Sequence, residues 1–180
     1  GCSPIEIRLS QEETSYWAQT IFQLSHELCH YAIRQSKKNK LFTLSWFEEI
    51  VCEAMSLYIL KWSAENWNDC CKLEKKFDAQ INDYLHKELA KRGNDNFQEC
   101  NSLALLKKYD AEKDRGSHRN ERNGLYYEII KNPMLCSCFC DYEKYVKDDK
   151  VTIDFDRWEK NDDNPMIRFL HRLQPCIGFC

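Results

Sequence analysis

The stretch from Ser25 to His30 constrains this chain more than any other, because it places two histidines four positions apart in a helix-forming segment. An α-helix turns through about 100° per residue, so His26 and His30 lie one turn apart on the same face. Two neutral imidazoles at this spacing are typical ligands of one Zn²⁺ ion. Glu27 is displaced sideways, where it can act on a water molecule rather than on the metal. The competing interpretation is an ordinary amphipathic helix with two surface histidines.

The composition favours a soluble, mainly α protein that forms one domain over residues 1–180. The chain has only 5 Gly and 4 Pro, while 31% of its residues are charged and 13% are aromatic. Its net charge of −3 comes from 26 basic and 29 acidic residues spread along the sequence, so neither nucleic acid nor an anionic membrane is indicated as a partner. No apolar run approaches the roughly 18 residues of a membrane-spanning helix.

The 11 cysteines raise the question of redox state. A chain of this length forms a core without disulfides, and Cys29 and Cys52 fall in helical segments, where buried reduced thiols are ordinary. We therefore expect a cytoplasmic protein. Cys136, Cys138 and Cys140 follow a C-x-C-x-C pattern, for which reduced packing cysteines are the favoured interpretation and a second, soft-metal site is the alternative.

The N-terminal residues predict a short strand before the histidine helix. Residues 5–9 alternate between apolar and polar side chains, and Pro4 precedes them, as suits a strand at a sheet edge. The chain begins with Gly1 rather than Met, so we expect a processed or trimmed N-terminus. A lipoprotein-type remnant, which would move the protein out of the cytosol, is the alternative.

Apolar periodicity and capping motifs predict helices over most of the chain. Capping boxes at 10–13 and 45–48 begin the first two helices, at about 11–34 and 46–63. In the first helix we expect one stripe of core residues and an adjacent face, with the histidines, that points to the interior or a cleft. The expected core stripe is Trp17, Ile21, Leu24, Leu28 and Tyr31; the adjacent face is Phe22, His26, His30 and Ile33. Further helices are predicted at about 68–92, 97–110, 117–131, 134–146 and 165–173, with a strand or loop at 151–155.

A third zinc ligand is expected from the second helix, which should pack antiparallel to the first. Eighteen residues separate His30 from Glu49. Glu48 is assigned to the capping box with its side chain turned back to the helix start, whereas Glu49 can face the first helix. Glu53 lies one turn further, where it could accept a hydrogen bond from a metal-bound histidine. Glu49 as ligand with Glu53 as orienting acid is one assignment; Glu53 as ligand, or surface acids near a helix N-terminus, are the alternatives.

His26-Glu27-Leu28-Cys29-His30 followed by Glu49 resembles the gluzincin metallopeptidases, the group that includes thermolysin and the zinc aminopeptidases. The aminopeptidases have the same interval before the ligand Glu and the same Trp-x-x-Glu context as 46–49. In thermolysin an acid four residues past that ligand orients a zinc histidine, as Glu53 would here. The resemblance covers about residues 5–58. Most of the sheet usual before the histidine helix and the Gly-x-Met-Glu-Asn exopeptidase motif are lacking.

The resemblance implies a zincin-like helical domain with one short edge strand or small sheet, and a zinc-dependent peptidase acting on a peptide or protein substrate. His26, His30 and Glu49 would hold Zn²⁺, Glu27 would be the general base, and Glu53 would orient a histidine. Two alternatives stay open: a non-catalytic binding or regulatory protein on the same scaffold, and a metal-free helical interaction domain. Candidate oxyanion donors are Tyr109, His118, Arg119, Tyr126, Tyr127 and His171.

Overall fold

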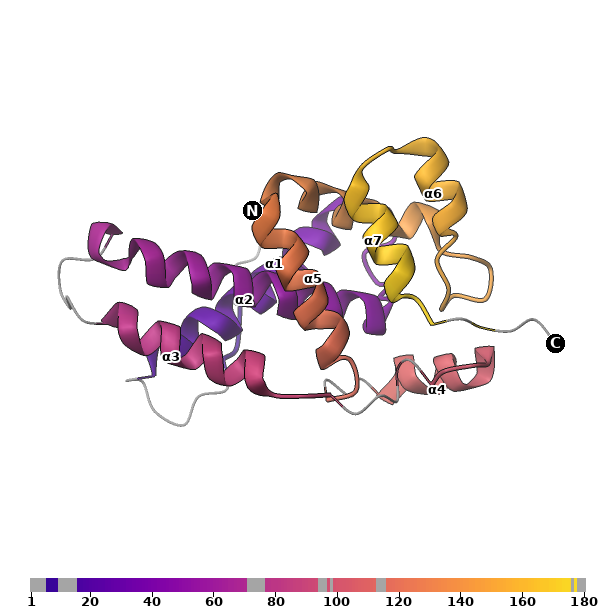
Figure 1. Ribbon diagram of the computed structural model, residues 1–180. Coiled ribbons are helices and arrows are strands. Elements are labelled where there is room, and N and C mark those ends of the chain that lie inside the picture. The colour runs from indigo at the N-terminus through magenta and orange to yellow at the C-terminus, as the bar shows by residue number, and fades with distance from the viewer. Residues whose placement is uncertain are drawn as a thin grey trace.

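The computed structural model describes residues 6–9, 16–70, 77–93, 97, 99–112, 116–175 and 177. Over these residues the chain forms seven α-helices and one long 3-10 helix (Figure 1). The mainly α prediction is confirmed. The elements are α1 (Trp17–Ser36), α2 (Ser45–Cys70), α3 (Phe77–Ala90), α4 (Leu103–Glu112), α5 (Arg119–Lys131), η1 (Pro133–Tyr145), α6 (Phe155–Asn161) and α7 (Pro165–Leu173).

The short edge strand is not found among the described residues. Residues 6–9 have no regular secondary structure, and Ile5 lies outside the described part of the chain. The β-pairing that the described residues do form is one isolated antiparallel bridge, between Val146 and Ile153. The prediction of a single domain over 1–180 stays a prediction.

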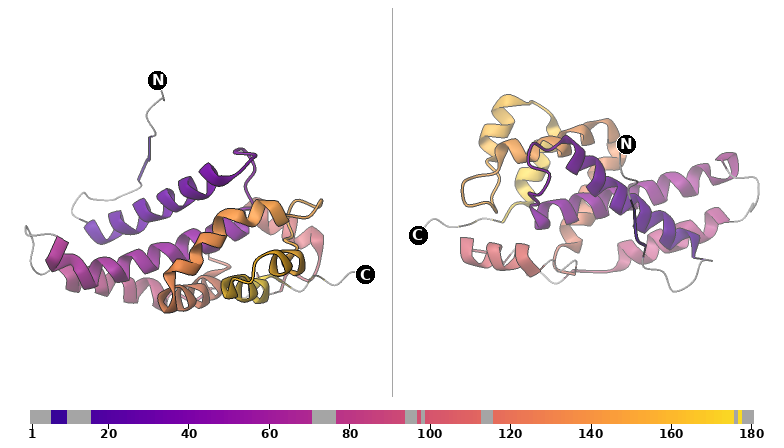
Figure 2. Two further views of the ribbon diagram at one scale, coloured as in Figure 1. Left: turned by 90° about the horizontal axis from the view of Figure 1, so that it is seen from above. Right: turned by 180° about the vertical axis from the view of Figure 1, so that it is seen from behind.

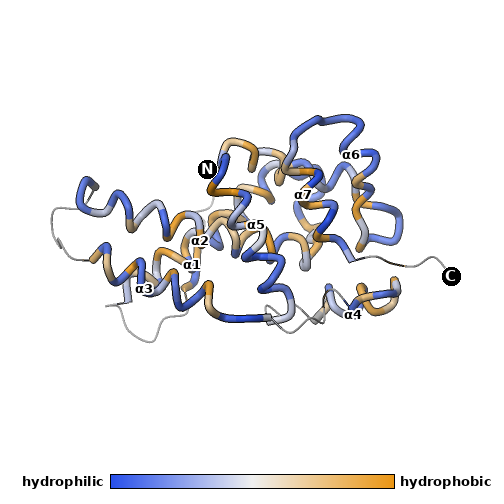
Figure 3. The backbone as a smooth tube through the Cα atoms, viewed as in Figure 1, coloured by the Kyte–Doolittle hydropathy of each residue, from blue (hydrophilic) through white to orange (hydrophobic). Residues whose placement is uncertain are grey.

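Helix α2 is the centre of the fold. Helices α1, α3 and α5 all pack against it, and Figure 2 shows α1 on one side of α2 with α5 and α7 on the other. Because neighbours surround its first half, that half is buried nearly all round rather than along one stripe, and orange segments meet there in Figure 3. Its buried apolar residues are Trp46, Phe47, Ile50, Val51, Cys52, Ala54, Leu57 and Leu60. Within the described chain, no helix combines the length and apolar character needed to cross a membrane.

The buried face of α1 is the one that carries the histidines. Its buried residues are Ala18, Phe22, His26 and Ile33, which confirms that this face points inward. The expected core stripe was largely wrong, because four of its members are 36–54% exposed: Trp17, Leu24, Leu28 and Tyr31. The face with the histidines is the one that α1 buries, and the periodicity alone does not say which of its two apolar faces is buried.

Helix boundaries differ from the sequence predictions at three places. Helix α2 continues through Asn68 and Asp69, where the third helix was expected to begin, and α3 begins only at Phe77. Helix α4 begins six residues later than predicted, after a turn that buries Phe97. The predicted capping box at 10–13 lies outside the described residues.

The C-terminal region contains one helix that the sequence analysis did not predict. Helix α6 begins at Phe155, and the Asp154 side chain accepts a hydrogen bond from Arg157 N at 3.1 Å, as an N-cap. The predicted helix at 134–146 is a 3-10 helix. Helix α7 begins at Pro165 and ends at Leu173, as predicted, with Asn164 as its N-cap.

Distant parts of the chain fix the start of α2 beside the histidines. Trp46 N donates to the Asp110 carboxylate at 2.9 Å, and Leu44 N donates to the Tyr142 hydroxyl at 3.2 Å. The Trp46 indole N–H donates to Val151 O at 2.8 Å. The first two bonds satisfy backbone donors that the start of a helix leaves open, and all three hold the start of α2, with its two glutamates, in place.

Candidate metal centre

Three side chains from α1 and α2 converge on one point. The Nε2 atoms of His26 and His30 lie 3.1 Å apart. Glu49 Oε2 lies 3.4 Å from His26 Nε2, and Glu49 Oε1 lies 3.4 Å from His30 Nε2. In a tetrahedral zinc site with bonds of about 2.0–2.1 Å, neighbouring ligand atoms are about 3.3–3.4 Å apart. The donor set therefore has the chemistry and the spacing for one divalent ion.

The sequence predicted these three residues, and the packing of α1 on α2 brings them together. Among the described residues they are the group of His, Cys, Asp and Glu side chains able to hold a metal ion. The two imidazole planes are inclined at 76°, so the rings approach through their edges and both direct Nε2 toward Glu49. The His26 side chain is 2% exposed and that of His30 is 23% exposed. The cluster is thus closed on the His26 side and open on the His30 side.

Glu48 has a role that the sequence analysis missed. Its carboxylate accepts from His30 Nδ1 at 3.1 Å and also from Lys37 Nζ and the Tyr142 hydroxyl. The expectation that Glu48 turns back to the helix start was wrong, because Asp110 caps that turn instead. A carboxylate on one ring nitrogen is what orients a metal-binding histidine. The sequence feature that could have indicated this role is the adjacent pair Glu48-Glu49, because two successive residues face different directions on a helix.

Burial and hydrogen bonding shift the pKa values of His30 and Glu48 in opposite directions. Burial disfavours the protonated His30 ring, but hydrogen bonds to Glu48 and Glu49 outweigh it and raise the His30 pKa to about 9. Burial likewise disfavours ionised Glu48, but hydrogen bonds from His30, Lys37 and Tyr142 hold its pKa below the usual value. A metal ion bound here would take the place of a proton, as is usual for metal-binding histidines.

Glu53 lies one turn beyond Glu49 on α2 and is buried. Its carboxylate is 3.2 Å from Arg122 Nη1, and Arg122 Nη2 donates to Glu88 O at 2.8 Å. Glu53 therefore joins α2 to α5 and α3. Its expected hydrogen bond to a metal-binding histidine stays a prediction.

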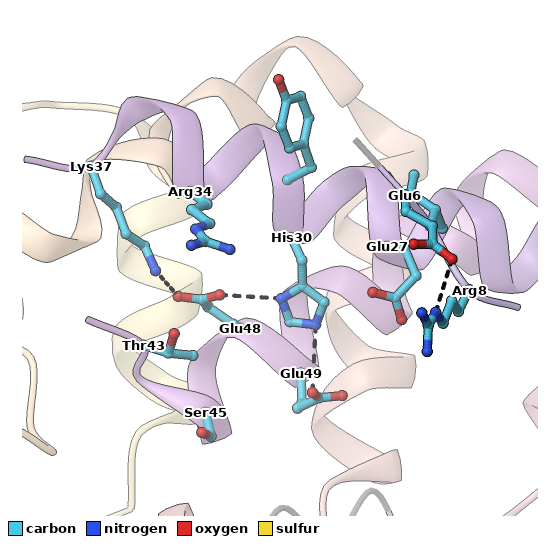
Figure 4. A pocket seen from close by; sticks show the side chains of 12 residues that line it. Glu6, Arg8, Glu27, His30, Arg34, Lys37, Thr43, Ser45, Glu48 and Glu49 are labelled. Atoms are coloured by element: carbon cyan, nitrogen blue, oxygen red, sulfur yellow. Dashed lines mark hydrogen bonds and ion pairs between the residues drawn. The ribbon is translucent and has the colours of Figure 1, made fainter. Parts of the chain in front are cut away.

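A pocket of about 380 Å³ opens beside the cluster (Figure 4). Glu27, His30 and Glu49 line it, and residues 6–8 form part of its wall. Figure 4 shows the Glu27 carboxylate on the side of His30 that faces Glu6 and Arg8, away from Glu48. The general base proposed from the sequence thus shares a solvent-accessible space with two of the predicted ligands. The described lining includes none of the six candidate oxyanion donors.

Three cysteines lie together beside α1. Cys29, Cys136 and Cys140 line a second pocket of about 460 Å³, with mainly apolar neighbours, and Cys138 is buried. Every cysteine whose state is described is a free thiol. A hydrogen bond with Cys52 lowers the pKa of the Cys29 thiol, against the effect of burial.

Comparison with known proteins identifies no relative. No protein-family model, no curated protein and no solved structure matches the chain. The residues and their geometry are therefore the basis on which a function can be proposed.

Proposed function

We propose that this protein is a zinc-dependent hydrolase of peptide bonds, built on a zincin-like helical scaffold. One observation carries the proposal: the Nε2 atoms of His26 and His30 and the carboxylate oxygens of Glu49 meet at 3.1–3.4 Å. The order of the ligands along the chain, His-Glu-x-x-His and then Glu, supports the same conclusion.

Three protein ligands leave one position open, which is the arrangement of catalytic rather than structural zinc. When bound, Zn²⁺ would lower the pKa of a water molecule to about 7 and polarise the scissile carbonyl. Glu27 takes the proton from the attacking water and then gives it to the leaving amine. Glu48 holds the His30 ring by Nδ1, so that Nε2 presents its lone pair to the metal.

The substrate reaches the site through the pocket beside His30. The pocket is bordered by a chain segment, residues 6–8, rather than closed by a helix, which suits an extended peptide lying along α1. A peptide or protein is therefore the proposed substrate, and no nucleic acid is proposed as a partner. The free thiols among the described cysteines support a reducing, cytoplasmic location.

The substitution Glu27→Gln tests the mechanism. Gln keeps the shape of the side chain but cannot take a proton, so hydrolysis should fall by about 10²–10⁴-fold while zinc content stays at one ion per chain. Cleavage of a peptide library by zinc-loaded protein, followed by mass spectrometry, measures the first effect, and metal analysis measures the second. Glu65→Gln is the matched control, because Glu65 is an exposed glutamate on α2.

The outcomes separate the proposal from its alternatives. A Glu27→Gln protein that cleaves peptides like the wild type would refute the role of Glu27. Zinc binding without cleavage of any library peptide would favour a binding or regulatory protein. If the wild-type protein takes up no zinc after reconstitution, the result would favour a metal-free helical interaction domain.

A further inference from the structure

The charged side chains of the pocket beside the metal centre are nearly all paired. Arg8 and Glu6 form an ion pair at 3.0 Å, and Lys37 pairs with Glu48. The Glu49 carboxylate lies against His26 and His30. Two charged residues of the lining are left after this pairing. One is the proposed general base, Glu27, and the other is Arg34.

Arg34 is an open cation in the part of the chain that the structure describes. No ion pair or hydrogen bond of its side chain with another described residue is found. Figure 4 shows its guanidinium in the pocket, on the same side of α1 as Lys37 and His30. The Lys37 ammonium is already bound to Glu48 and to Phe42 O at 2.9 Å, so it cannot take the same role.

The position of Arg34 relates it directly to the metal centre. It follows His30 by one helical turn, which corresponds to a rise of about 6 Å along the axis. An extended peptide advances about 3.3–3.6 Å per residue. A substrate whose scissile carbonyl lies at the metal centre therefore brings the next one or two residues within reach of the Arg34 side chain.

We propose that Arg34 binds a carboxylate of the substrate, and that the enzyme prefers peptides with a carboxylate one or two residues from the scissile bond. The guanidinium presents a planar pair of donors that matches a carboxylate. This inference rests on the proposed peptidase function. The carboxylate has two possible sources, the free C-terminus of a short peptide and the side chain of Asp or Glu.

Matched peptides distinguish these sources. The probe is one quenched fluorescent peptide: the best-cleaved library sequence or, if none is cleaved, an alanine-rich hexapeptide. It is made in four forms, with Asp or Asn after the scissile position and with a free or amidated C-terminus. The zinc-loaded full chain should cleave one charged form about tenfold better than its neutral counterpart, mainly through a lower KM.

Substitutions of Arg34 test whether this preference for a carboxylate depends on its side chain. Arg34→Gln should lose the preference, so that it cleaves the charged and neutral forms equally well, and Arg34→Lys should keep part of the preference. Arg168→Gln is the control, since it removes one exposed arginine charge from α7, outside the pocket lining. A preference that survives in Arg34→Gln would overturn the inference.

A second readout does not depend on hydrolysis. The NMR signal of Arg34 Nε–Hε, assigned by its loss in Arg34→Gln, should shift with a carboxylate-bearing peptide and not with the neutral form. An equal response to both forms, or no response, would overturn the inference. Cleavage without any charge preference would leave the peptidase standing and remove this proposal. Absence of all cleavage together with a carboxylate-specific shift would overturn the peptidase and its cleavage preference, and would keep only carboxylate binding at Arg34.

Discussion

At the scale of single residues, one imidazole ring joins the two adjacent glutamates. His30 Nδ1 lies 3.1 Å from Glu48 and His30 Nε2 lies 3.4 Å from Glu49. Successive residues on a helix face directions about 100° apart, so Glu48 and Glu49 approach the ring from two sides. Lys37 balances the charge of Glu48, which leaves Glu49 as the carboxylate directed at both histidines.

This arrangement predicts that Glu48→Gln weakens zinc binding without replacing a ligand. Loss of a carboxylate that orients a metal-binding histidine typically costs 10–100-fold in affinity. Competition with a chelating dye would measure the affinity, and thermal unfolding would show that the variant folds. The exposed Glu65→Gln change should leave zinc affinity at the wild-type value. Equal affinities in the two variants would contradict the role of Glu48.

The sequence could predict the histidines and Glu49 because their relation is local: two positions on one helix and a fixed interval to the next. It could not assign Glu48 in the same way. The partners that draw this carboxylate away from the helix start include Tyr142, and the residue that replaces it as cap is Asp110. Both lie far along the chain, and only the packing brings them close.

At the scale of elements, a buried arginine on α5 ties three helices together. Arg122 is 1% exposed and contacts Glu53 on α2 at 3.2 Å and Glu88 on α3 at 3.7 Å. Asn123, the next residue, donates to Leu89 O at 3.1 Å. Removal of one partner leaves buried charges without compensation, which is far more costly than loss of a surface ion pair.

We therefore expect Arg122→Met to lower the free energy of unfolding by about 3–5 kcal/mol. Urea denaturation followed by circular dichroism measures this change. Arg168→Met, at an exposed position of α7, should cost well under about 1 kcal/mol. A loss below about 1 kcal/mol in Arg122→Met would show that the buried contacts contribute no more than surface pairs.

The N-cap of α6 gives a smaller, local prediction. Asp154→Ala removes the acceptor for Arg157 N and should lower the free energy of unfolding by about 1 kcal/mol, whereas Asp154→Ser should restore most of it. Thermal and urea unfolding of the three proteins measures the difference. Equal stability of the Ala and Ser variants would contradict a capping role.

Elements with a clear start and stop, such as α5 and α7, could be predicted from the sequence. The incorrect prediction of the buried face of α1 shows what apolar periodicity cannot determine. Trp17 and Leu24 follow a helical stripe as well as Phe22 does, but the face of Phe22 is the buried one, and its ring lies 6.1 Å from that of Tyr84. Which stripe becomes core is decided by helices that follow later in the chain.

At the scale of the whole molecule, α1 lies between two pockets, one polar and one apolar. The pocket beside His30 is lined mainly by charged and polar side chains, and the one beside Cys29 by apolar side chains and thiols. The same short motif faces both, because His30 and Cys29 are adjacent on α1. The candidate metal centre thus depends on how α1 packs against α2. Residues of α4, η1 and the loop after η1 hold the start of α2 in its position.

The most direct test is X-ray absorption spectroscopy of the zinc-reconstituted full chain, together with metal analysis. We expect about one zinc per chain, with nitrogen and oxygen ligands at about 2.0–2.2 Å and imidazole scattering from two histidines. We also expect that the His30→Ala protein loses this signal. No bound zinc, or zinc held by sulfur at about 2.3 Å, would contradict the account, because the ion would then lie away from His26, His30 and Glu49.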